Sequence, residues 1–137
     1  MRQDEAPQIL LSDYQEPAFW VETVDLFFKL DPTKTRVKSN IKFIANPNRI
    51  DGPHSLELDG RMLKLISAEI DNSEIDLNQI NINTEGLSIS SEFIPQSGFT
   101  WTSEVEINPQ SNTALEGLYI SKGMYCTQCE AQGFRKI

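Results

Sequence analysis

Apolar and polar residues alternate along two neighbouring stretches near the start of the chain. In the first, residues 20–31, one face carries Val24, Leu26, Phe28 and Leu30. In the second, residues 36–45, one face carries Val37, Ser39, Ile41, Phe43 and Ala45. A period of two with aromatic and β-branched residues is typical of strands, and the Asp-Pro-Thr sequence between the stretches is typical of a turn. The pattern predicts a hairpin that belongs to an antiparallel sheet with one solvated face.

Shorter apolar runs separated by polar turns continue to about residue 108. We expect strands over residues 55–59 and 63–71, and three very short strands around residues 75–77, 80–82 and 87–89. The last run, residues 99–108, predicts a strand with Phe99, Trp101, Val105 and Ile107 inward. No stretch has the pattern of a convincing amphipathic helix. Many short strands at regular spacing predict an all-β fold, an antiparallel sandwich or barrel with little or no helix.

Length and charge limit the classes of function. The chain has 137 residues, the size of one domain, and a net charge of −8 that repels phosphate backbones, so nucleic acid is not an expected partner. The sequence has no run of eighteen apolar residues, which argues against a membrane span. The amino end, MRQDEAPQ, is acidic and lacks the apolar core of a secretory signal. We therefore expect a cytoplasmic protein.

Both cysteines, Cys126 and Cys129, form a Cys-x-x-Cys pair near the carboxy end. Structural zinc needs four ligands, and the single histidine, His54, is about seventy residues away. A redox pair would be expected within a βαβ pattern, which is absent around these residues. The residues therefore favour two reduced thiols and no metal site, and no sequence pattern of a complete catalytic site is present. Trp20 and Trp101 are suited either to a sugar-binding platform or to a core, and strand spacing favours the core.

Three segments carry a resemblance to a known family. The segment DYQEPAFWVETVDLFFKLDPTKTRV, residues 13–37, and the segment LELDGRMLKLISAEID, residues 56–71, resemble the opening of the bacterial branch of the aminopeptidase N family. The segment NPQSNTALEGLYISKGMYCTQCEAQGFRKI, residues 108–137, is very similar to its most specific signature. One departure is Gln132, where the branch usually has glutamate. The chain is thereby identified as the amino-terminal domain of a member of this gluzincin family.

The resemblance implies that the parent protein is a zinc-dependent aminopeptidase, which removes amino-terminal residues from peptides. Its amino-terminal domain would be a β-sandwich or saddle, and the zinc centre would lie in a downstream domain. We therefore expect an amino-terminal arm at residues 1–18, a β-sandwich domain at residues 19–123, and a segment at residues 124–137 that leads to the catalytic domain. The partners implied are that catalytic domain and peptides with a free amino terminus. The 137 residues alone are expected to be inactive and to need no cofactor.

The resemblance also assigns roles to two residues. Glu130 would bind the free α-ammonium group of the substrate, and Gln128 would line the pocket for the first side chain. No catalytic residue and no metal ligand are expected within these residues. The alternative is a free-standing β-sandwich module that binds a protein or a carbohydrate without a catalytic role.

Overall fold

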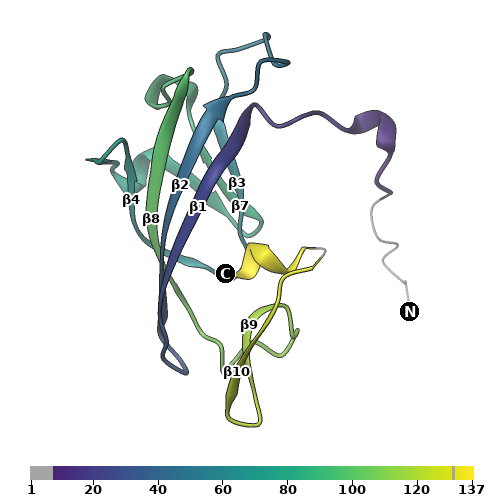
Figure 1. The fold of residues 1–137 in the computed structure, drawn as a ribbon, viewed down its shortest axis with the longest axis vertical. Coiled ribbons are helices and arrows are strands. Elements are labelled where there is room, and N and C mark those ends of the chain that lie inside the picture. The colour runs from purple at the N-terminus through teal and green to yellow at the C-terminus, as the bar shows by residue number, and fades with distance from the viewer. Residues whose placement is uncertain (1–7, 131) are drawn as a thin grey trace.

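The computed structural model describes residues 8–130 and 132–137, in which every strand pairing is antiparallel (Figure 1). The larger sheet has the order β1-β2-β8-β4-β5, and its strands are β1 (Phe19–Lys29), β2 (Thr35–Ala45), β8 (Gly98–Ile107), β4 (Lys64–Ile70) and β5 (Ser73–Glu74). A smaller sheet has the order β3-β7-β6, formed by β3 (Leu56–Asp59), β7 (Gly86–Ile89) and β6 (Ile80–Asn83). The predicted all-β antiparallel class is confirmed.

The remaining elements are one hairpin and four short helical turns. β9 (Gly117–Ser121) and β10 (Met124–Gln128) pair only with each other among the described residues. The turns are 3-10 helices, namely η1 (Leu11–Asp13), η2 (Leu77–Gln79), η3 (Ser91–Phe93) and η4 (Gly133–Lys136). In the described ranges no helix is long and apolar enough to cross a membrane.

The predicted hairpin is formed by β1 and β2. Val24 lies opposite Ile41, and Phe28 lies opposite Val37, so the apolar residues of both strands share one face of the sheet. The connecting turn is closed by Asp31, whose Oδ1 accepts hydrogen bonds from the backbone N–H groups of Thr33 (3.0 Å) and Lys34 (2.9 Å). These two bonds favour the charged carboxylate and lower the pKa of Asp31.

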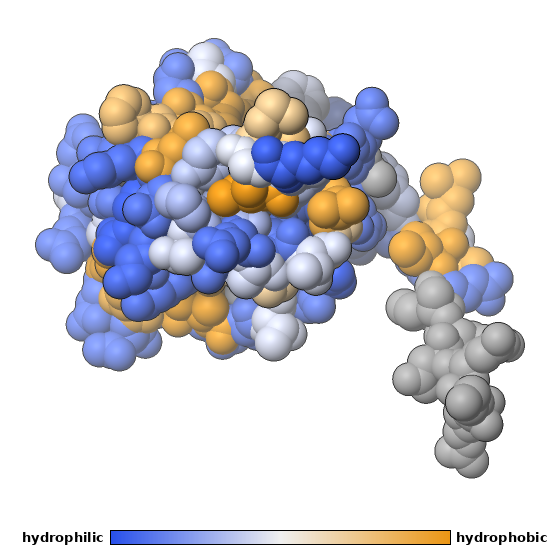
Figure 2. All heavy atoms as spheres, turned by 90° about the horizontal axis from the view of Figure 1, so that it is seen from below, coloured by the Kyte–Doolittle hydropathy of each residue, from blue (hydrophilic) through white to orange (hydrophobic). Residues whose placement is uncertain are grey.

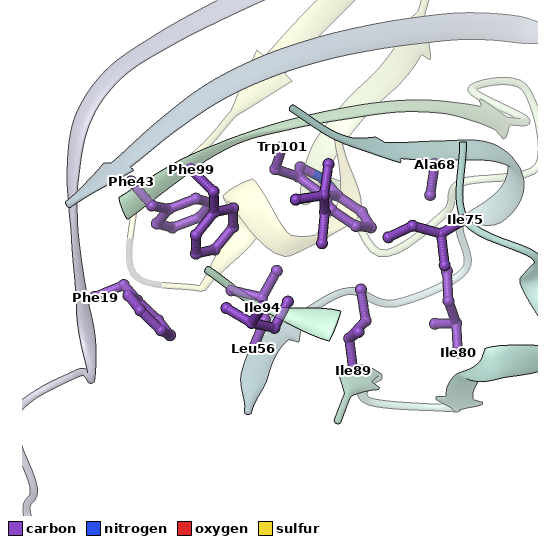
Figure 3. Close-up of a cluster of buried hydrophobic side chains, with 11 residues drawn as sticks. Phe19, Phe43, Leu56, Ala68, Ile75, Ile80, Ile89, Ile94, Phe99 and Trp101 are labelled. Atoms are coloured by element: carbon purple, nitrogen blue, oxygen red, sulfur yellow. The ribbon is translucent and has the colours of Figure 1, made fainter. Parts of the chain in front are cut away.

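The main core lies between the two sheets and contains side chains from both (Figure 3). Trp101 of β8 is 2% exposed and Ile89 of β7 is fully buried. Phe99 stacks on Phe43 with ring centroids 5.1 Å apart and meets Phe19 edge-on. The buried members of the cluster are Phe19, Phe43, Leu56, Ala68, Ile70, Ile75, Ile80, Ile89, Ile94, Phe99 and Trp101. The inward positions predicted for Phe99, Trp101 and Ile107 are confirmed.

The strand predicted around residues 75–77 is wrong. The chain there forms the start of η2, because the Asp76 side chain accepts a hydrogen bond from the backbone N–H of Asn78 (2.9 Å) and caps the turn. Ile75 is buried in the core, whereas Leu77 is exposed. Period-two alternation over three residues cannot distinguish a strand from a capped turn.

The arm predicted for residues 1–18 is described from residue 8 onward; residues 1–7 lie outside the described part. Residues 8–17 extend away from the sheets and join them at Phe19 (Figure 1). Glu16 fixes the junction, since its Oε2 accepts hydrogen bonds from the side-chain amides of Asn46 and Asn48, both at 3.0 Å. At the other end, the boundary expected between residues 123 and 124 falls in the turn of the β9–β10 hairpin.

Candidate functional site

The β9–β10 hairpin determines where Gln128 lies. Its two-residue turn is Lys122–Gly123, and both residues have positive φ angles, 51° and 78°, as a type I′ turn requires. The register that follows places Met124 opposite Ser121 and Gln128 opposite Gly117. Gln128 is therefore the last paired residue of β10, and its side chain is exposed.

Glu130 lies in the turn that follows β10. Its backbone carbonyl accepts a hydrogen bond from the N–H of Gly133 at 3.1 Å, which closes the chain back toward η4. The residue is exposed, and within residues 8–130 and 132–137 its carboxylate forms no ion pair. Both carboxylate oxygens are therefore available to accept hydrogen bonds from a cationic group.

The last residues are held against the body of the domain. The backbone N–H of Arg61 donates to the carbonyl of Arg135 at 2.9 Å, and Lys136 Nζ lies 3.2 Å from Glu116 Oε2. Ile137 packs against a second apolar cluster whose buried members are Val37, Ile107 and Leu118. The turn that carries Glu130 is thus fixed at both ends, by β10 on one side and by the docked η4 on the other.

Large apolar side chains are exposed on β10, on η4 and in the loop before β9. They belong to Leu115, Met124, Tyr125 and Phe134, which are 54%, 64%, 37% and 51% exposed. Figure 2 views the end of the molecule at which the hairpin lies and shows several separate apolar groups among polar side chains.

The described residues do not fit a metal ion. Cys126 is half-buried, with its Sγ 3.7 Å from the carbonyl of Met124, and Cys129 is exposed; both are free thiols. His54 packs edge-on against Phe19 in a different part of the molecule. Among residues 8–130 and 132–137, no three His, Cys, Asp or Glu side chains are grouped as metal ligands.

His54 has a carboxylate neighbour, and no nucleophile among residues 8–130 and 132–137 is bonded to its ring. Its Nε2 is buried, has no hydrogen-bond partner in the part of the chain that the structure describes, and lies 3.5 Å from Asp51 Oδ1. Asp51 is bound by Arg49, and this hydrogen bond lowers the pKa of the aspartate and raises that of the arginine. The backbone N–H of His54 donates to Gln96 Oε1, and the Gln96 amide donates to the His54 carbonyl. This group stabilises a loop and has no arrangement for acyl transfer.

The two tryptophans lie on opposite faces of the larger sheet. Trp101 lies opposite Ile41, and Trp20 lies opposite Ile44, three residues further along β2. An odd separation along a strand places side chains on opposite faces. Trp101 is in the core and Trp20 is 40% exposed, so the pair does not form a common platform for a sugar ring.

A cavity of about 490 Å³ was not foreseen from the sequence. It lies between the inner face of the larger sheet, the smaller sheet and η4, and its lining includes Leu26, Ser39, Leu58, Trp101, Ser103 and Phe134. Gln128 and Glu130 do not line it. A signal that could have indicated the cavity is the pair of serines, Ser39 and Ser103, at inward positions of two adjacent strands. A serine side chain fills less space than the apolar side chains around it.

The chain is similar to known proteins along its whole length. No family model matches. The chain is similar to aminopeptidase N of Caulobacter vibrioides, with 41% identity over 138 residues that cover 100% of this chain and 15% of that protein. It is also 39% identical to aminopeptidase N of Escherichia coli K12, over 91% of this chain and 13% of that protein. With aminopeptidase N of Haemophilus influenzae it shares 34% identity, over 91% of this chain and 14% of that protein.

A solved structure has the same fold. It is the crystal structure of Legionella pneumophila aminopeptidase A in complex with aspartic acid, with a TM-score of 0.81 and 29% identity. The match covers 92% of this chain and 14% of that one. The chain therefore spans only 13–15% of the length of the relatives that it matches.

Proposed function

The chain belongs to the aminopeptidase N family, and we propose that it is the amino-terminal domain of a zinc-dependent aminopeptidase in which Glu130 recognises the free α-ammonium group of a peptide. The parent protein would remove amino-terminal residues from peptides in the cytoplasm. This domain would supply one wall of the active-site chamber, and its partner would be the catalytic domain of the same polypeptide. The observation that carries the proposal is an exposed carboxylate, without an ion pair among the described residues, in a turn fixed at both ends.

A carboxylate is suited to this task because an exopeptidase must distinguish a free amino terminus from an internal amide. A charged ammonium group donates charge-assisted hydrogen bonds to a carboxylate, whereas an uncharged amide leaves a desolvated carboxylate unpaired. The difference in binding free energy between the two substrates is the source of specificity. A fixed anchor also limits how far the peptide can enter, which determines the bond that reaches the reacting centre.

Gln128 would contact the first side chain of the peptide. It leaves the end of β10 two residues before Glu130 and is also exposed. Its amide is uncharged and can both donate and accept hydrogen bonds, which suits a residue that adjusts preference rather than providing most of the affinity. We expect Gln128→Ala to change the preferred first residue more than the overall rate.

The zinc ion implied by the family does not fit the described residues of this chain. Cys126 and Cys129 have no third ligand close to them in the described ranges. The ligands of the metal would therefore belong to the remainder of the polypeptide. When bound there, zinc would polarise the scissile carbonyl and activate a water molecule. The part assigned to this domain is limited to holding and orienting the peptide.

The proposal is tested by Glu130→Gln in the full-length protein. This change keeps the shape of the side chain and removes its charge, and we expect kcat/KM on an aminoacyl arylamide to fall roughly 10- to 200-fold, the equivalent of one charge-assisted hydrogen bond. Glu74→Gln, an exposed glutamate in β5 at the edge of the larger sheet, is the matched control. Full activity of Glu130→Gln would contradict the proposal. Loss of activity together with a lowered unfolding midpoint would assign Glu130 a structural role instead.

A further inference from the structure

Gly133 touches the end of the strand that carries Gln128. A β-carbon built on Gly133 would lie 2.1 Å from the carbonyl oxygen of Gln128 and 3.3 Å from the backbone nitrogen of Gly117. Both neighbours are backbone atoms, so a rotamer change cannot relieve the contact. Gly133 is also the donor of the 3.1 Å hydrogen bond to the carbonyl of Glu130. The two ends of the turn therefore meet at Gly133.

Gly117 completes the contact from the other side. Its φ angle is +72°, a value that favours glycine, and it lies directly opposite Gln128 in the β9–β10 pairing. A β-carbon there would lie 2.7 Å from the Cβ of Lys136 and 3.1 Å from the carbonyl oxygen of Gly133. Three backbone segments thus meet without side chains between them, at the start of β9, the end of β10 and the start of η4.

We propose that Gly117 and Gly133 form a glycine junction that positions Glu130 for its contact with the substrate. This inference rests on the proposed function of Glu130. The junction holds the two ends of the turn together because no side chain separates the backbone of Gln128 from Gly133. Adding one methyl group at residue 133 must move the backbone at the base of the turn by about 1 Å, because the β-carbon would lie 2.1 Å from the Gln128 carbonyl oxygen and such contacts are essentially never under 3.0 Å. A displacement of that size at a binding group can reduce catalytic efficiency up to about 100-fold.

The hairpin itself provides a matched control. Gly123, in the turn between β9 and β10, also has a positive φ angle, +78°, but a β-carbon there would have no atom within 4 Å. Gly123→Ala and Gly133→Ala therefore each add one methyl group, at opposite ends of the same hairpin. Only Gly133→Ala forces two backbone segments apart.

The test is a double-mutant cycle in the full-length protein, with Gly133→Ala, Glu130→Gln and the double variant, and with kcat/KM on a free-amine arylamide as the readout. We expect Gly133→Ala to lower kcat/KM about 10- to 100-fold. The kcat/KM of Gly123→Ala should stay within about threefold of that of the parent. The double variant should lose no more than Glu130→Gln alone, within about threefold, because a displaced side chain and a neutral one remove the same interaction. A purely structural role of Gly133 would instead give losses that multiply.

Each other outcome has a distinct meaning. No effect of Glu130→Gln would overturn the proposed function, whereas a loss with Glu130→Gln and none with Gly133→Ala would overturn the glycine junction alone. Multiplying losses would also overturn it. If Gly133→Ala does not fold, Gly117→Ala repeats the cycle from the other side of the contact. Failure of both to fold would show that the junction serves the fold rather than the position of Glu130, and would overturn the proposal.

Discussion

The side-chain hydroxyls of Ser39 and Ser103 lie 2.7 Å apart on the inner face of the larger sheet, where β2 and β8 place the two residues opposite each other. Both residues line the cavity, and Ser103 is only 7% exposed. They are polar residues in an otherwise apolar row, and each hydroxyl is the hydrogen-bond partner of the other.

We expect either single change, Ser39→Ala or Ser103→Ala, to lower the free energy of unfolding by about 1–3 kcal/mol, because the remaining hydroxyl loses its partner. The double variant should cost less than the sum of the two, since it leaves no unpaired hydroxyl. Urea unfolding of the parent, the two single variants and the double variant measures the coupling energy between the two hydroxyls. Additive effects would indicate that the two hydroxyls do not depend on each other.

The two tryptophans provide a comparison of the two faces of the same sheet. Trp101→Ala removes a side chain that is 2% exposed and should lower the free energy of unfolding by about 3–5 kcal/mol. Trp20→Ala, on the other face, should cost less than about 1 kcal/mol. Thermal or urea unfolding of both variants measures the difference. Equal costs would mean that Trp20 packs against a surface outside the described residues.

The arm should be released in acid. The hydrogen bonds that Asn48 and Asn46 donate to Glu16 lower its pKa below the ordinary value of 4.5. A lowered pKa in the folded state means that the carboxylate stabilises the fold above pH 4.5 and that this contribution is lost as the pH falls through the lower, folded value. Glu16→Gln should therefore flatten the acid side of the curve of stability against pH. Curves that remain parallel for the parent and the variant would contradict this role of Glu16.

The 137-residue chain should neither hydrolyse aminoacyl arylamides nor bind zinc in a one-to-one ratio. The reason is the ligand set, with two thiols at Cys126 and Cys129 and no third ligand grouped with them among the described residues. Metal analysis of protein purified without chelator measures the zinc content. One tightly bound zinc ion per chain that is lost in Cys126→Ser would show that the cysteines are ligands.

The larger elements could be predicted from the sequence because they follow a simple period. The alternation of apolar residues in β1, β2 and β8 identified both the strands and the inward position of Trp101. Leu77 was placed in a strand because the side-chain cap from Asp76 is a local competitor that apolar spacing does not reveal. Short segments are decided by such individual hydrogen bonds, and long segments by the burial of many residues.

The candidate site was predicted from a different kind of evidence than the strands. No period or spacing marks Glu130, and its assigned role came from the resemblance of the last thirty residues to a family signature. The contact between Gly133 and Gln128 could not be predicted, because it depends on the path of the backbone after β10. A glycine in a sequence shows only that a side chain is absent; the neighbours that require its absence appear in three dimensions.

The most direct test of the central claim compares two inhibitors of the full-length protein that differ only in the α-amino group, a short peptide analogue and its desamino counterpart. If the Glu130 carboxylate binds the ammonium group, Glu130→Gln should weaken the amine inhibitor roughly 10- to 200-fold and leave the desamino inhibitor unchanged. The ratio of the two inhibition constants should then fall by the same factor. Equal weakening of both inhibitors, or an unchanged ratio, would contradict recognition of the amino terminus by Glu130.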